Sequence, residues 1–149
     1  MLSKSQQTGR FGKKGKIKIS NADKWFSIFI RLRDIVQPSG LCRCITCGKF
    51  VYWKDMDCGH FVSRARPATR FTESNCHAQC THCNRFLHGN EFEYGKAIDS
   101  LYGIGTAQKL KNLGAIRGQK VHSKDALEII SDIYRVKSKQ LAHEKGVEI

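Results

Sequence analysis

The chain contains 149 residues, and its 26 lysines and arginines outnumber its 13 aspartates and glutamates, which gives a formal net charge of +13. This length fits one domain, and a hydrophobic fraction of 40% supports a packed core and argues against wholesale disorder. No apolar run approaches the roughly 18 residues of a membrane span. The basic, glycine-rich start also lacks the hydrophobic stretch of a secretory signal, so we expect a cytoplasmic protein.

The excess of positive charge favours a polyanionic partner. Nucleic acid is the usual one, and an anionic membrane surface is the second. No long basic amphipathic helix is evident, so we expect no membrane partner. The seven cysteines indicate metal binding or catalysis, because disulfides are rare in a reducing compartment and an odd number cannot pair completely.

The first element in chain order is a basic segment, residues 1–20, which contains six lysines and arginines and no acidic residue. Glycines interrupt any periodicity, so we interpret it as a flexible arm that either follows phosphates or serves only solubility. A helix is predicted over residues 21–36, capped by Ser20 or Asn21 and ended by Pro38 and Gly40. Its expected core face is an apolar stripe: Trp25, Phe29, Leu32 and Val36.

The middle of the chain, residues 41–88, is rich in cysteine and irregular. Residues 50–53 and 56–62 favour two short strands of one hairpin, with Lys54 and Asp55 at the turn, and a helix is expected from Thr81 onward. Three further helices are predicted over 91–102, 106–113 and 124–145. The last is expected to turn five side chains inward: Ala126, Ile130, Ile133, Tyr134 and Leu141.

Two Cys-x-x-Cys pairs predict a structural zinc site. They are Cys44 with Cys47 and Cys80 with Cys83. A two-residue spacer lets one tight turn present both sulfurs to one ion, and two such turns close a tetrahedral four-cysteine site with no open position. Cys42 is also close enough to Cys47 in the sequence, and Cys76 to Cys80, to serve as a ligand. Which four cysteines bind the zinc therefore stays open at this point. Four buried or redox-active cysteines are the alternative.

Between and after these pairs lies a second constellation: His60, Asn75, Asn84 and His88. His60, Asn75 and Asn84 fall on the three positions of the HNH, or ββα-metal, nuclease motif, so the chain resembles an H-N-N variant of that family. Asn84 at the last position is similar to the phage junction-resolving enzymes with a four-cysteine zinc.

The chemistry of these residues fits the same roles. Phosphodiester hydrolysis needs an activated water and a Lewis acid, and a neutral imidazole makes His60 the candidate general base. Asn84 and His88, four apart on one helix face, are candidate ligands of Mg²⁺, with Mn²⁺ as the alternative. Asp57 is a candidate third ligand, although Cys58 and Gly59 separate it from His60. Asn75 would fix the loop and orient His60.

Four arginines cluster within residues 64–85 against the single acidic residue Glu73. Arginine matches phosphate oxygens bidentately, so these side chains are candidate contacts to DNA phosphates, with a solvated surface as the alternative. They are Arg64, Arg66, Arg70 and Arg85.

Longer strings of the sequence resemble the NinG/Rap family of lambdoid phages over about residues 21–104. The resemblance implies a recombination endonuclease of the bacterial host's cytoplasm that nicks branched DNA, such as Holliday junctions and D-loops, with Mg²⁺-type metal help. The strings are 22–26 (ADKWF), 42–44 (CRC) with 46–49 (TCGK), 53–55 (WKD) with 59–61 (GHF), 68–71 (ATRF), 75–80 (NCHAQC), 83–86 (CNRF) and 89–90 (GN).

Together these features predict an α+β protein with a zinc-stapled ββα-metal nuclease core flanked by helices. We expect a basic arm at 1–20, a nuclease domain at 21–104 and a helical region at 105–149. A homodimer would match the two symmetric strands of a junction. The alternatives are a general nicking or packaging-associated HNH endonuclease, a non-catalytic zinc-stabilised DNA-binding protein, and a redox-sensing cysteine protein.

Overall fold

The computed structural model describes residues 18–36 and 38–149, so residues 1–17 of the predicted basic arm lie outside the described part of the chain. The helices are α1 (Asn21–Arg33), α2 (Pro67–Arg70), α3 (Glu91–Tyr102), α4 (Thr106–Ala115) and α5 (Lys124–Lys145), with short turns η1 (Trp53–Asp55), η2 (Glu73–Asn75) and η3 (His82–Phe86). The strands are β1 (Leu41–Arg43), β2 (Phe50–Tyr52), β3 (Asp57–His60) and β4 (Cys76–Gln79).

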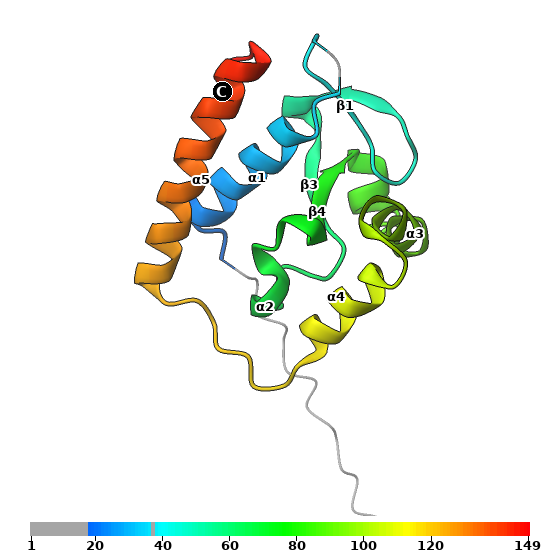
Figure 1. The fold of residues 1–149 in the computed structure, drawn as a ribbon, viewed down its shortest axis with the longest axis vertical. Helices are drawn as coiled ribbons and strands as arrows, with labels where there is room; N and C mark the ends of the chain where they lie inside the picture. Colours follow the sequence, from blue (N-terminus) through cyan, green and yellow to red (C-terminus); the bar gives the residue numbers. More distant parts are fainter. Residues whose placement is uncertain (1–17, 37) are drawn as a thin grey trace, which may run out of the picture.

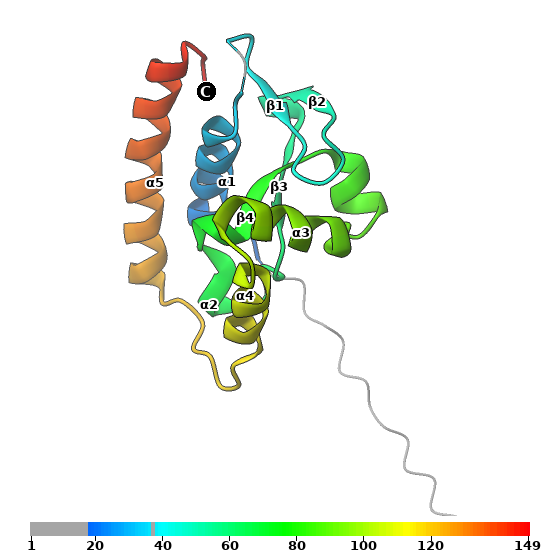
Figure 2. The same cartoon turned by 45° about the vertical axis from the view of Figure 1, so that its right-hand side comes forward.

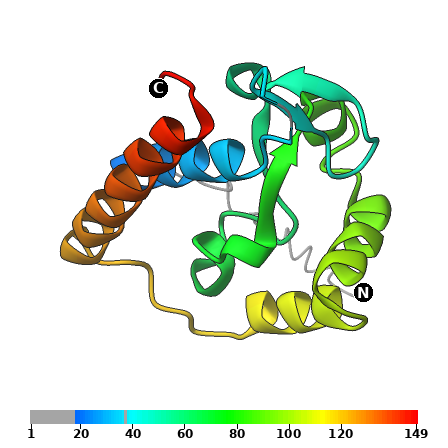
Figure 3. The same cartoon turned by 45° about the horizontal axis from the view of Figure 1, so that its top comes forward.

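The elements form layers around the β3–β4 pair (Figure 1). Helix α5 runs along α1, α1 lies against β3 and β4, and α3 and α4 cover the opposite side. The turned views show the same order: α5 is outermost in Figure 2, and α4 closes the lower edge in Figure 3. Within residues 18–36 and 38–149, no helix combines the length and apolar character needed to cross a bilayer.

Helix α1 is buried on two sides, which the predicted stripe did not capture. Its N-cap is Ser20, one of the two predicted candidates, and Ser20 forms a capping box with Asp23. Leu32 is buried, but Val36 lies beyond the helix and is 58% exposed. Phe26 and Ile30, outside the stripe, are buried because α1 packs on β3 and β4 as well as on α5. A helix between two layers has no single apolar face.

The predicted hairpin is wrong in its pairing. β2 pairs antiparallel with β1, and β3 pairs antiparallel with β4. The residues between β2 and β3 form η1 rather than a hairpin turn. The turn that joins β1 to β2 carries Cys44 and Cys47, and β4 follows β3 only after a long loop. These pairings depend on contacts distant in sequence, which local propensity does not reveal.

The three C-terminal helices are confirmed. α5 covers the predicted range 124–145, and Tyr134 is buried against α1. Ile133 is the exception, because it is 48% exposed. Ser138 and Ala142 take the buried positions of the helix instead. The buried face of α5 therefore combines Tyr134 with the small side chains of Ser138 and Ala142.

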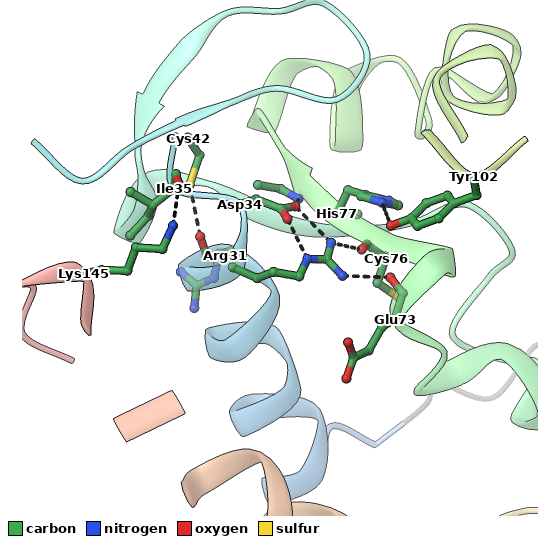
Figure 4. Close-up of polar contacts among 12 residues, drawn as sticks. Arg31, Asp34, Ile35, Cys42, Glu73, Cys76, His77, Tyr102 and Lys145 are labelled. Carbon is green, nitrogen blue, oxygen red and sulfur yellow. Dashed lines mark hydrogen bonds and ion pairs between the residues drawn. The ribbon is translucent and has the colours of Figure 1, made fainter. Parts of the chain in front are cut away.

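The C-terminal end of α1 holds β4 through a polar network (Figure 4). Arg33 donates to the carbonyls of Glu73 (3.0 Å) and Cys76 (2.8 Å), and its guanidinium pairs with Asp34. The Asp34 carboxylate accepts the backbone N–H of Ala78 at 2.7 Å. The backbone carbonyl of Cys76 and the N–H of Ala78, at the edge of β4 that faces α1, thereby have hydrogen-bond partners. These contacts fix the strand that supports the site described below.

Candidate functional site

Four cysteines converge where the β1–β2 turn meets the end of β4. The sulfurs of Cys44, Cys47, Cys80 and Cys83 all lie within 4.8 Å of one another. The Cys47 and Cys80 sulfurs are 3.7 Å apart. Two thiolates at about 2.3 Å from one tetrahedral zinc lie about 3.8 Å apart, so the cluster fits that ion. The clustering predicted for these four residues is confirmed, and Cys42 and Cys76 are not part of it.

Neighbouring donors support a thiolate at Cys44, whereas burial raises the pKa of Cys47 and of Cys80. The N–H of Cys80 points at the Cys44 sulfur at 3.3 Å, and the Thr46 hydroxyl lies 3.3 Å from the same sulfur. Burial opposes ionisation of Cys44, but hydrogen bonds from the backbone of Cys47 and Cys80 lower its pKa to about 6. Such contacts orient thiolate ligands and favour their charged form.

A cavity of about 370 Å³ lies beside the cysteine cluster and opens to solvent. It brings together three residues of the predicted constellation with one of the predicted arginines: His60, Asn84, His88 and Arg64. The remaining lining residues are Cys58, Phe61, Ser63 and Gly89. Residues from the end of β3, the following loop and the segment after the second cysteine pair therefore share one concave surface.

The predicted helix after Thr81 is replaced by a single π-helical turn followed by an irregular turn. The π-helical turn η3 ends at Phe86, and His88 adopts a left-handed backbone conformation with φ of 50°. The N–H of Gly89 returns to the carbonyl of Cys83 at 2.9 Å, and Gln79 donates to the carbonyl of Gly89 at 2.8 Å. Asn84 and His88 thus reach the same cavity through a turn and not through one helix face.

His60 has a defined hydrogen-bonding arrangement. Its Nε2 lies 3.1 Å from the carbonyl oxygen of Arg70. A carbonyl can only accept, so Nε2 carries the proton and Nδ1 carries the lone pair of the neutral ring. Burial lowers the pKa of His60, and the nearby charge of Arg64 lowers it further. The imidazole is therefore neutral at pH 7 and able to accept a proton.

Asn75 is fully buried and ties the loop after β3 to η2. Its Oδ1 accepts the backbone N–H of Val62 at 2.8 Å. Its Nδ2 donates to the carbonyls of Val62 (3.0 Å) and Thr69 (3.1 Å). The loop that it holds leads to Arg70, whose carbonyl accepts the hydrogen bond of His60, so Asn75 acts on His60 through the backbone.

Asp57 does not line the cavity. Its carboxylate accepts from Asn84 Nδ2 at 2.9 Å and from the Arg85 guanidinium at 2.9 and 2.7 Å. Burial would raise the pKa of Asp57, but the hydrogen bonds from Arg85 and Asn84 hold it below its ordinary value. Among the described residues, Asp57 and His88 belong to neither group of clustered histidine, cysteine and acidic ligands. In this arrangement the Asp57 carboxylate is held by Asn84 and Arg85, and its role as a third ligand stays a prediction.

The four predicted phosphate contacts differ in position. Arg64 lines the cavity, and its buried Nε has no hydrogen-bond partner in the described part of the chain. Arg66 is exposed, and Arg85 is exposed but paired with Asp57. Arg70 differs from its predicted role as a phosphate contact. Its guanidinium binds Asp23 at 2.6 and 2.9 Å and is largely buried. Its role here is to join α1 to α2.

Two supporting contacts were missed in the sequence. A Cβ on Gly59 would lie 2.4 Å from Gln79 Oε1, so only glycine leaves room for the side chain that holds the turn after His88. Tyr94 donates to the carbonyl of Gly59 at 2.8 Å and meets His77 at 3.2 Å. The glycine inside the Asp57–His60 string was the available signal, but its partner could be found only once β3 and β4 were paired.

The comparisons with known proteins give one match. A family model described as bacteriophage lambda NinG protein matches residues 4–144. No curated protein and no solved structure matches the chain. The match covers most of the chain, including the cysteine cluster, the cavity and α5.

Proposed function

This chain belongs to the NinG family of bacteriophage proteins, and we propose that it is a metal-dependent HNH endonuclease of phage recombination that cleaves branched DNA such as Holliday junctions and D-loops. The observation that carries the proposal is the single cavity lined by His60, Asn84, His88 and Arg64 beside a four-cysteine cluster. These groups supply a base, cation ligands and a phosphate contact within one surface, which hydrolysis of a phosphodiester requires.

His60 is the proposed general base. Its Nδ1 accepts a proton from the attacking water, the water oxygen forms a bond to phosphorus, and the bond to the departing oxygen breaks. The carbonyl of Arg70 holds the Nε2 proton and stabilises the imidazolium that forms. The lowered pKa keeps His60 neutral and ready at pH 7. Asn75 is a positioning residue, because it fixes the loop that carries this carbonyl.

Asn84 and His88 are the residues that would hold a Mg²⁺ or Mn²⁺ ion, with oxygen and imidazole donors suited to either. Such an ion, when bound, polarises the phosphate and relieves charge at the departing oxygen. The Asn84 amide nitrogen donates to Asp57, which leaves the amide oxygen for the cation. We therefore assign Asp57 to orienting Asn84.

DNA is the proposed partner. The net charge of +13 supports a polyanionic ligand, and Arg64 lines the cavity. Arg66 and Arg85 are exposed and lie in the same region of the sequence.

A zinc in the four-cysteine cluster is assigned a structural role, because four thiolates leave no open coordination position.

We further propose a homodimer, because a four-way junction presents two symmetric strands for cleavage. Helix α5 carries a row of exposed apolar side chains suited to such a contact: Ile129, Ile133 and Val136. A strictly monomeric protein, alone and on DNA, that still cut both strands would contradict this assignment.

The test is cleavage of a labelled four-way junction and of a linear duplex of matched sequence, each with Mg²⁺ present or omitted. Omission is preferable to strong chelation, which would also remove zinc from the cysteines. We expect Mg²⁺-dependent cutting of the junction and little cutting of the duplex. Equal rates on both substrates would support a general HNH nicking enzyme instead. No cutting of either by folded, zinc-loaded protein would leave a non-catalytic DNA-binding protein.

A further inference from the structure

The described residues contain a second group of clustered ligands, formed by Cys58, His60 and Cys76, whose ligand atoms lie within 4.8 Å of one another. We propose that these three side chains form a second, thiophilic metal site, which takes a soft divalent ion such as Zn²⁺ and, when filled, silences His60. The group is separate from the four-cysteine cluster and includes two of the cysteines left over there.

Strand geometry places the three side chains on one face. In the β3–β4 pair, His60 lies opposite Cys76, and Cys58 lies opposite Ala78. Alternate residues of a strand share a face, so Cys58 and His60 point the same way, and Cys76 meets them from the neighbouring strand. Two rigid strands thus hold the three donors, so the site needs no mobile segment.

A metal suits this geometry better than a disulfide. Cys58 and Cys76 are diagonal neighbours across an antiparallel pair, where Cα atoms lie about 7–8 Å apart. A disulfide requires a Cα separation of about 4.4–6.8 Å. Ligands of one tetrahedral zinc lie about 3.5–3.8 Å apart, so the present spacing of up to 4.8 Å needs an adjustment of about 1.3 Å at most.

The surroundings define the coordination. Cys76 is fully buried in the core with Phe26 and Ile30, while Cys58 and His60 line the cavity. An ion held by these three donors would therefore have its fourth position toward the cavity and solvent. Two thiols and one neutral imidazole would bind Zn²⁺ with release of two protons, which leaves no net charge on the buried group. This donor set favours zinc over Mg²⁺.

The consequence for activity rests on the proposed function. A nitrogen that binds Zn²⁺ has no lone pair for the attacking water, so an occupied site would block His60 as a base. Low zinc would then support the fold through the four-cysteine cluster, whereas higher zinc would inhibit cleavage.

The direct test counts zinc per chain after saturation with Zn²⁺ and removal of the unbound ion. We expect two equivalents in the wild type and one in Cys58→Ala, whose side chain is only half-buried and so less critical for folding. Cys42→Ala is the matched control, because Cys42 is buried outside both clusters, and should keep two. One equivalent in the wild type, or two in Cys58→Ala, would overturn the proposal.

A second measurement follows junction cleavage in Mg²⁺ as zinc is added, relative to each variant's own rate without added zinc. Loss of one ligand should raise the inhibitory zinc concentration of Cys58→Ala by more than about 10-fold, since even the loss of a ligand's outer partner weakens binding by about 10–100-fold. Inhibition of the wild type and of Cys58→Ala at the same zinc concentration would refute the proposal that bound zinc blocks His60. The zinc count needs no activity, so a second bound zinc in a protein that cuts nothing would refute only the nuclease.

Discussion

Asn75 is the residue on which the loop after β3 most depends, and Asn75→Ala should destabilise the protein strongly. The substitution leaves both the N–H and the carbonyl of Val62 without a hydrogen-bond partner. It also removes one hydrogen bond to the Thr69 carbonyl, which still accepts the N–H of Thr72. Each of the two orphaned groups of Val62 costs about 1–3 kcal/mol and the further lost hydrogen bond about 1 kcal/mol, so the expected loss is about 3–7 kcal/mol.

Urea unfolding of zinc-loaded protein measures this loss, and hydrogen exchange at the Val62 amide shows whether the loop opens locally. Asn84→Ala is the matched control, because Asn84 is only half-buried and makes one side-chain hydrogen bond, to Asp57. Its expected cost is below about 1.5 kcal/mol. A loss under about 1 kcal/mol for Asn75→Ala, with Val62 still protected from exchange, would refute the reasoning.

Three further predictions follow from the charged and metal-binding groups. Cys83→Ser should lose the zinc of the four-cysteine cluster and much of its stability, measured by zinc content and thermal unfolding, because metal binding supplies folding energy there. The ion pair with Arg70 holds the pKa of Asp23 below its ordinary value of 3.8 despite burial. The pair therefore stabilises the folded protein fully above about pH 4, and this contribution disappears as the pH falls through the folded-state pKa. Asp23→Asn should flatten this acid dependence of stability and lower the free energy of unfolding by about 3 kcal/mol at neutral pH. Arg64→Gln should weaken DNA binding and reduce its salt slope by about 1 without lowering the melting temperature, whereas Arg70→Gln should lower the melting temperature and leave the slope unchanged.

The local elements could be predicted because their signals lie within a few residues. Ser20 and Asp23 specify the start of α1, and the spacing of Cys44 with Cys47 and of Cys80 with Cys83 specifies the cluster. The predicted range of α5 also agrees with the structure, because Ser123 caps it and Gly146 ends it.

The strand pairing and the detailed roles of charged residues could not be predicted in the same way. β3 pairs with β4 across a long loop, so neither the contact of Gly59 with Gln79 nor the approach of Cys58 to Cys76 has a local signal. Arg70 looked like a phosphate contact because its partner, Asp23, lies in a different helix. Electrostatic partners of this kind are defined by packing and not by spacing in the chain.

The central claim is that His60 serves as the base of a DNA-cleaving site. The most direct measurement is the single-turnover rate on a four-way junction in Mg²⁺ for the wild type, His60→Ala and the control His143→Ala, whose side chain is exposed on α5. The account predicts that His60→Ala retains the zinc of the four-cysteine cluster and junction binding but cleaves about 10²–10⁴-fold more slowly, while the control is unaffected. A wild-type rate in His60→Ala, or no cleavage by the wild type, would contradict it.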